Sequence, residues 1–236
     1  MKDIKAILFD VFGTVVDWRG SIIREVTAVA DELGVSGDWG RFADRWRDGY
    51  YTGTKDVVEG RRHWVSADAL HLERLEILKP ECGLESLNEE ATIRLNKAWH
   101  RLDPWPDAVE GLTSLKQTFI IGTLSNGNNG LLVHMAKHAG LPWDIIMGGE
   151  NFQSYKPHAS VYLGAVESLG YETHEVMIAA AHITDLQNAK KNGLSTAFVV
   201  RPDEFGDGEY EPDLEADESV DIEASDFKNL AAKLGT

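Results

Sequence analysis

Short apolar runs alternate with amphipathic segments along most of the chain. Residues 4–10 read IKAILFD, a nearly continuous apolar run ending in an acid, as in a parallel strand buried on both faces. Similar runs cover residues 119–124, 143–148, 175–180 and 195–200, with helical spacing between them at 107–117, 128–138, 158–169 and 185–192. Residues 220–234 add a short strand and a helix. This alternation predicts an α/β fold with a doubly wound parallel sheet.

Residues 18–100 interrupt the alternation, because they show helical patterns and no good strand. Apolar residues fall at helical spacing from Ile22 to Leu33, with Ser21 as the expected cap and Gly34 as the expected end. The sequence therefore predicts two domains. They are a Rossmann-like catalytic core, residues 1–14 and 101–236, and an inserted helical cap, residues 15–100.

Composition narrows the class of protein. The 236 residues carry a formal net charge of −16, which disfavours binding to nucleic acid or to anionic membranes. Cys82 is the single cysteine, so no disulfide forms within the chain, and we predict a cytoplasmic protein. No apolar run approaches the length of a membrane span. Residues 203–223 hold eleven acids and are expected to form a solvated surface loop.

Polar residues follow four of the predicted strands. In open α/β sheets ligands bind outside the carboxyl ends of the strands, so these positions are the candidate site. They are Asp10 with Thr14, then Ser125 with Asn126 and Gly127, then Lys156, and finally His182 with Asp185. Each is a weak signal alone, since an acid at a strand end is commonly a cap and Ser-Asn-Gly is commonly a turn. Their order, each after a strand, makes the set specific.

This ordered set resembles the haloacid dehalogenase superfamily, whose motifs are a nucleophilic Asp, a Ser or Thr, a Lys and a terminal acid. The stretch DVFGTVVDW, residues 10–18, has Phe12 where the superfamily's phosphatases have a second Asp that protonates the leaving oxygen. Ala181 likewise stands where those phosphatases hold magnesium with an acid. Both departures resemble the (S)-2-haloacid dehalogenase (type II) branch, because a halide leaves without a proton.

The resemblance covers essentially the whole chain and implies an enzyme acting on carbon–halide bonds. Its expected substrates are short 2-haloalkanoic acids, and its expected chemistry is a covalent ester on Asp10 that water hydrolyses. No metal and no other cofactor are expected. Lys156 and Thr14 are expected to hold Asp10 ionised. Tyr162 is expected to support Lys156 and to belong to the substrate-binding site. A homodimer is common in the family and is a possible state here.

The resemblance also implies ligands for the two ends of the substrate. Thr14, Ser125 and amides near Asn126 would bind the carboxylate. Arg47 would bind the halide, with Asn126 sharing it, and Arg45 is the rival arginine. The aromatic residues expected to wall a small dry pocket, or simply to pack in the core, are Trp18, Tyr50, Trp64 and Trp105.

His182 departs from the Asn that many dehalogenases of this branch have at the equivalent position. Its ordinary pKa lies near neutrality, so it is a candidate base for the hydrolytic water, with Asp17 orienting it. The alternative is Asp185 as the base and His182 as a hydrogen-bonding spacer. Two other functions stay open at this stage: a phosphatase with atypical motifs, and a non-catalytic binding protein on the same fold.

Overall fold

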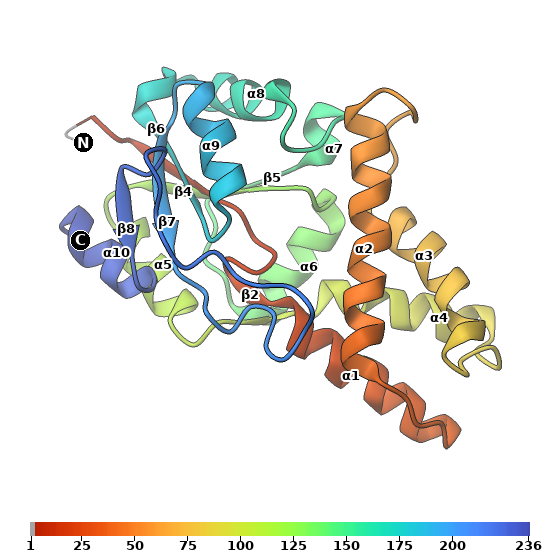
Figure 1. Ribbon diagram of the computed structural model, residues 1–236. Helices are drawn as coiled ribbons and strands as arrows, with labels where there is room; N and C mark the ends of the chain where they lie inside the picture. The colour runs from red at the N-terminus through yellow and green to blue at the C-terminus, as the bar shows by residue number, and fades with distance from the viewer. Residues whose placement is uncertain (1–2) are drawn as a thin grey trace.

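The computed structural model describes residues 3–236, and it has a central parallel sheet covered by helices on both faces (Figure 1). The sheet has six strands in the order β5-β4-β1-β6-β7-β8. They are β1 (Ala6–Phe9), β4 (Ile120–Ser125), β5 (Ile145–Gly148), β6 (Val176–Ala180), β7 (Ser195–Val199) and β8 (Ile222–Ala224). The predicted doubly wound sheet is confirmed, because every strand pair in it is parallel.

The helices fall into a core set and a cap set. The core helices are α5 (Ala108–Lys116), α6 (Asn129–Ala139), α7 (Gly149–Phe152), α8 (Ala159–Leu169), α9 (Ile183–Lys191) and α10 (Phe227–Leu234), with the short helix η2 (Thr173–Glu175). The cap helices are α1 (Trp18–Leu33), α2 (Trp39–Val58), α3 (Ala67–Glu81) and α4 (Glu89–Asn96), followed by η1 (Lys97–His100). Figure 1 shows the cap helices gathered beside the carboxyl edge of the sheet.

The register of the central strands brings the predicted site residues together. Phe9, the last residue of β1, is level with Thr123 of β4 and Ala179 of β6. The loops that follow these three strands therefore begin at the same edge of the sheet, on either side of Asp10. This edge is where strand order reverses around β1, the place at which open α/β sheets bind ligands.

A two-stranded antiparallel ribbon joins the cap to the core. Its strands are β2 (Val16–Asp17) and β3 (Asp103–Pro104). Asp17 caps α1 by accepting a hydrogen bond from the Gly20 amide at 2.8 Å, so the helix begins at Trp18. The expected cap at Ser21 is therefore wrong, because a side chain four residues earlier already satisfies the free amides. The domain boundaries themselves stay a prediction.

The acidic segment 203–223 is not uniformly solvated, which corrects the expectation for it. It leaves β7, passes beside α1 and the cap, and returns to β8 (Figure 1). Arg19 of α1 donates to Asp207 at 2.8 Å, and Tyr210 donates to Asp48 of α2 at 2.6 Å. Glu204 lies almost completely buried, with 1% of its surface exposed. Within residues 3–236 no helix is both long and apolar enough to span a membrane.

Candidate active site

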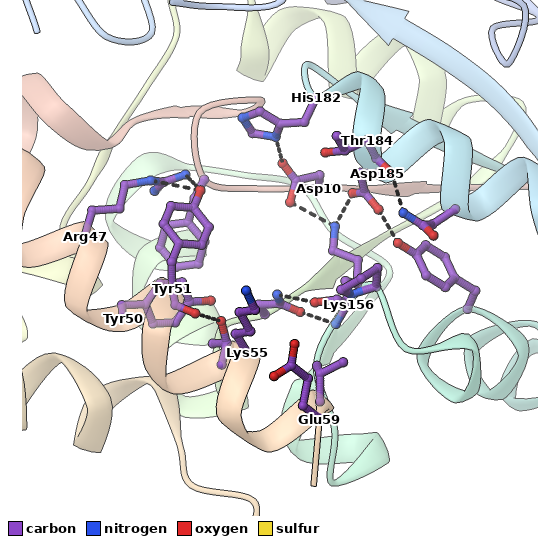
Figure 2. Close-up of a pocket in the computed structure, with 17 residues that line it drawn as sticks. Asp10, Arg47, Tyr50, Tyr51, Lys55, Glu59, Lys156, His182, Thr184 and Asp185 are labelled. Atoms are coloured by element: carbon purple, nitrogen blue, oxygen red, sulfur yellow. Dashed lines mark hydrogen bonds and ion pairs between the residues drawn. The ribbon is translucent and has the colours of Figure 1, made fainter. Parts of the chain in front are cut away.

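Asp10 lies directly after β1, at the centre of a polar cluster (Figure 2). Its Oδ2 accepts a hydrogen bond from the Thr14 hydroxyl at 2.8 Å and lies 3.0 Å from Nδ1 of His182. Its Oδ1 accepts from the Lys156 ammonium at 3.0 Å. Only 7% of Asp10 is exposed, and it lines a cavity of about 500 Å³ between the core and α2. The cluster thus presents one carboxylate to this cavity.

Charge around Asp10 keeps it ionised. Burial alone raises the pKa of this carboxyl group, but Lys156 and His182 outweigh burial and hold the pKa well below its ordinary value. Burial conversely lowers the pKa of Lys156, and the two carboxylates of Asp10 and Asp185 bring it above its ordinary value. An ionised, buried and oriented carboxylate is what a nucleophile requires.

Lys156 is held from both its side chain and its backbone. Its ammonium also pairs with Asp185, and Asp185 accepts a hydrogen bond from the Tyr162 hydroxyl at 2.6 Å. Tyr162 therefore supports Lys156 through Asp185. The Asn126 side chain accepts from the Lys156 amide at 2.7 Å and donates to its carbonyl at 3.1 Å. Asn126, at the end of β4, thus fixes the loop that carries the lysine.

His182 pairs with an acid that the sequence did not single out. Its Nε2 lies 3.0 Å from both carboxylate oxygens of Glu204. Burial lowers the pKa of His182, but Glu204 and Asp10 together raise it well above its ordinary value, so this environment favours the protonated ring. Asp17 was expected to orient His182, and this is wrong because Asp17 caps α1. No local pattern distinguishes Glu204 from the other acids of its loop.

Arg47 reaches the cavity from the cap, whereas Arg45 does not. Arg47 is 5% exposed, and its guanidinium stacks on the Trp18 ring at 4.3 Å. It donates to the Tyr51 hydroxyl at 2.8 Å and lies 3.8 Å from Glu204. The rival Arg45 pairs with Glu81 on the surface of the cap and does not line the cavity.

The two positions that set this site apart from a phosphatase site hold apolar side chains. Phe12 lines the cavity and packs edge-on against Trp99, with the ring centroids 6.1 Å apart. Ala181 is buried, and its amide donates to the Thr14 hydroxyl at 2.9 Å. In the part of the chain that the structure describes, no three His, Cys, Asp or Glu side chains are grouped closely enough to hold a metal ion.

Several residues that were expected to line the cavity do not line it. Ser125 and Thr14 are fully buried outside it, and Ser125 accepts a hydrogen bond from the Gly127 amide at 3.2 Å. Of the four aromatic residues proposed as walls, Tyr50 alone lines the cavity. Trp18 supports Arg47 from behind, and Trp105 donates to the Gly13 carbonyl at 2.7 Å. Sequence spacing predicted that these rings lie near the site, but it could not predict which of them point into the cavity.

Comparison with known proteins shows the family to which this chain belongs. The family model described as a haloacid dehalogenase-like hydrolase matches residues 4–193. The chain belongs to this hydrolase family. The resemblance inferred from the sequence motifs is therefore confirmed, as is the α/β fold with a helical cap.

Relatives of this hydrolase include several dehalogenases. This chain is 29% identical to (S)-2-haloacid dehalogenase 4A of Burkholderia cepacia over 221 residues, which cover 90% of each chain. Among solved structures, a defluorinating L-2-haloacid dehalogenase superposes with a TM-score of 0.94 and 44% identity, covering 99% of this chain and 96% of the other. A second L-2-haloacid dehalogenase superposes with a TM-score of 0.92 and 43% identity, covering 98% of this chain and 100% of the other.

Proposed function

We propose that this hydrolase cleaves the carbon–halogen bond of short 2-haloalkanoic acids, namely haloacetates and L-2-halopropionates. The products are a 2-hydroxy acid, halide and a proton, and no metal takes part. The observation that carries the proposal is the ionised Asp10 at the cavity, with Phe12 at the position two residues later where a phosphatase has its second acid. The substrates named for the similar proteins agree with this chemistry.

In the first step Asp10 attacks C2 of the substrate and displaces the halide. Oδ1 is the better nucleophile, because Oδ2 already accepts from Thr14 and faces His182, whereas Oδ1 has only the Lys156 ammonium. Attack opposite the departing halide inverts C2 and forms an ester on Asp10. Arg47 and the second amide proton of Asn126 receive the halide.

The substrate carboxylate binds on the core side of the cavity. The donors available there are Lys156 and the backbone amides that follow β4 near Asn126. Ser125 remains a predicted ligand, although it is buried and does not line the cavity, and its hydroxyl oxygen accepts from the Gly127 amide. Thr14 positions Asp10 and does not contact the substrate itself, since its hydroxyl donates to Asp10.

In the second step water attacks the carbonyl carbon of the Asp10 ester. Esterification removes the negative charge of Asp10, which is one of the causes that raise the pKa of His182. The ring then gives its Nδ1 proton to solvent, as the proton that the overall reaction releases, while Nε2–H continues to donate to Glu204. Neutral Nδ1, facing the former Oδ2, takes a proton from the attacking water. When the tetrahedral intermediate collapses, the proton of its hydroxyl group passes to the departing alkoxide oxygen. Asp10 is thereby released as the carboxylate, the 2-hydroxy acid leaves, and His182 keeps the proton taken from water.

The test measures halide released from chloroacetate and from each enantiomer of 2-chloropropionate, in buffer containing a metal chelator. The control is Asp10→Asn, which keeps the shape of the side chain and removes the nucleophile. We expect release from chloroacetate and the L enantiomer, and at least a thousandfold loss in the control. A single turnover in ¹⁸O-labelled water should place one label in Asp10.

Three outcomes would contradict all or part of the proposal. Folded protein that releases no halide from any of these acids would remove the dehalogenase function. Release of phosphate from phosphate esters only when magnesium is added would favour the phosphatase alternative. Halide release that persists in Asp10→Asn would instead exclude the covalent ester while keeping the overall reaction.

A further inference from the structure

The cavity is larger than a two- or three-carbon acid requires. Its volume of about 500 Å³ falls in the range of pockets that hold drug-sized ligands. One water occupies about 30 Å³ of liquid, so the cavity has room for more than ten waters. A haloacetate would fill only the part next to Asp10. The remaining space extends along α2 toward Lys55 and Glu59, at the end of the cavity opposite His182 (Figure 2).

Lys55 is the one cation of this cavity that lacks a carboxylate partner within residues 3–236. Lys156 pairs with Asp10 and Asp185, and Arg47 lies 3.8 Å from Glu204. No ion pair or hydrogen bond engages the Lys55 ammonium in the described part of the chain. Two neighbouring acids, Asp56 in α2 and Glu59 just after it, do not pair with Lys55 either, because both pair with Arg61.

Lys55 follows Arg47 by eight residues on one face of α2. That spacing corresponds to about 12 Å along the helix axis, since each residue adds about 1.5 Å. Tyr51 lies between the two cations on α2 (Figure 2). Val58 from the cap, and Phe12 and Pro157 from the core, add apolar surface elsewhere in the cavity. The cavity thus offers a reaction centre at one end, apolar side chains in its lining and, near the other end, the exposed and unpaired ammonium of Lys55.

We propose that Lys55 binds a second anionic group on the substrate, so that the site accepts 2-halogenated dicarboxylic acids of four to six carbons. This inference rests on the proposed dehalogenase function. The reaction is unchanged: the halide leaves C2, water supplies the hydroxyl group, and the products are a 2-hydroxy dicarboxylate, halide and a proton. The methylene groups of the acid lie against the apolar side chains of the lining, and its distal carboxylate pairs with the ammonium of Lys55.

The kinetic test compares matched substrates. Halide release is measured for 2-chlorosuccinate, 2-chloroglutarate and 2-chloroadipate beside 2-chlorobutyrate, 2-chlorovalerate and 2-chlorohexanoate, which have the same chain lengths and one carboxylate. The variant is Lys55→Gln. The matched control is Lys137→Gln, which removes an exposed charge near the end of α6, away from the cavity. We expect Lys55→Gln to lower kcat/KM about tenfold for the best dicarboxylate and less than twofold for its monocarboxylate partner.

A binding test separates this inference from the function on which it rests. In Asp10→Asn protein, the rise in Tm caused by succinate, glutarate or adipate is compared with the rise caused by butyrate, valerate or hexanoate. We expect a larger rise with at least one dicarboxylate, and loss of the excess when Lys55→Gln is added. Absence of all halide release would count against the proposed function alone, because this binding result still decides whether Lys55 receives an anion.

Equal effects of Lys55→Gln on the two substrate series would overturn the inference, as would equal stabilisation by the two ligand series. Better turnover of the long monocarboxylates than of the dicarboxylates would also overturn it, and would assign the extra volume to an uncharged chain. A decrease of the same size in Lys137→Gln would attribute the effect to net charge.

Discussion

Glu204 is buried against several groups that the proposed mechanism uses. Its carboxylate faces Nε2 of His182, accepts from the Trp18 indole at 3.3 Å, and lies 3.8 Å from Arg47. We expect Glu204→Gln to slow hydrolysis of the Asp10 ester about a hundredfold or more, because a positioned general base contributes about 10²–10⁴-fold. Formation of the ester should change much less. Rapid-quench assays should therefore show one halide released per site in a burst, followed by slow turnover.

The control for this variant is Glu209→Gln, which removes an exposed acid from the same loop. It should retain the kinetics of the parent enzyme. Mass spectrometry of the quenched Glu204→Gln protein should find the ester on the peptide that contains Asp10. Turnover without a burst, at an unchanged rate, would leave Asp185 as the base and make His182 a hydrogen-bonding spacer.

Gly13 lies in the turn after Asp10, where a side chain would meet the carboxylate of Glu204. Its φ is +84°, and a Cβ at this position would lie 2.0 Å from Oε1 of Glu204. Gly13→Ala should therefore lower stability and displace Glu204 from His182. Gly60→Ala is a matched control, since Gly60 has φ +70° and nothing within 4 Å of its added Cβ.

We expect Gly60→Ala to cost about 1 kcal/mol in the free energy of unfolding, the backbone term alone. Gly13→Ala should cost clearly more and should also slow ester hydrolysis, as Glu204→Gln does. Urea unfolding and burst kinetics measure the two effects. Equal losses of stability in both variants, with normal turnover in Gly13→Ala, would show that the turn accommodates a methyl group.

At the scale of elements, one buried ion pair ties the nucleophile turn to two core helices. Arg201, just after β7, donates to both carboxylate oxygens of Asp107 at 2.7 and 2.9 Å and to the Thr14 carbonyl at 2.8 Å. Asp107 precedes α5 and also accepts from the Phe227 amide at the start of α10, at 2.7 Å. Removing one partner of such a pair leaves an uncompensated buried charge.

We expect Asp107→Asn to cost about 3–5 kcal/mol in the free energy of unfolding. Glu110→Gln, which breaks an exposed pair with Lys228, should cost less than about 1 kcal/mol. Burial raises the pKa of Asp107, but Arg201 brings it below its ordinary 3.8. The pair therefore stabilises the fold fully above about pH 4 and less as pH falls through the lowered pKa. Urea unfolding at pH 7 and pH 5 should give the same difference between Asp107→Asn and the parent protein.

The elements of the core were predictable because their signal is local. Runs such as residues 119–124 are bounded by turns, and the observed β4 begins and ends within one residue of that run. The order of polar residues after the strands likewise predicted that Asp10, Lys156 and Asp185 meet, and they do. The functional residues that the sequence did not predict depend on tertiary contacts. Glu204 has no local feature that separates it from neighbouring acids, and only the path of its loop buries it beside His182.

At the scale of the whole molecule, a polar cluster fixes the cap on the core. Asp68, at the start of cap helix α3, donates from its amide to the Asn128 side chain at 3.1 Å. Its carboxylate lies 2.7 Å from Nε2 of His100 and accepts from Lys97 at 3.0 Å. His100 in turn lies 2.9 Å from Nδ1 of His134 on core helix α6. Asn128 follows Asn126 closely, so this cluster sets the position of the cap relative to the catalytic loop.

Asp68→Ala should therefore loosen the docking of the cap, which carries Arg47, onto the core. We expect kcat/KM for a haloacid to fall about tenfold and Tm to fall by several degrees, because Lys97 and His100 lose a partly buried partner. Asp56→Ala is the control, since it removes an acid of the cap that pairs on the surface with Arg61. An equal effect in both variants would attribute the loss to the cap's charge rather than to docking.

The pH dependence of this effect follows from the pKa of Asp68. Burial raises that pKa, but His100 and Lys97 outweigh burial and bring it below its ordinary value of 3.8. A lowered pKa in the folded state contributes stability that is complete above about pH 4 and disappears as pH falls through the lowered value. The difference in Tm between Asp68→Ala and the parent should thus stay constant from pH 8 to pH 5. A difference that shrinks within this range would show that the histidines, and not Asp68, determine how firmly the cap is held.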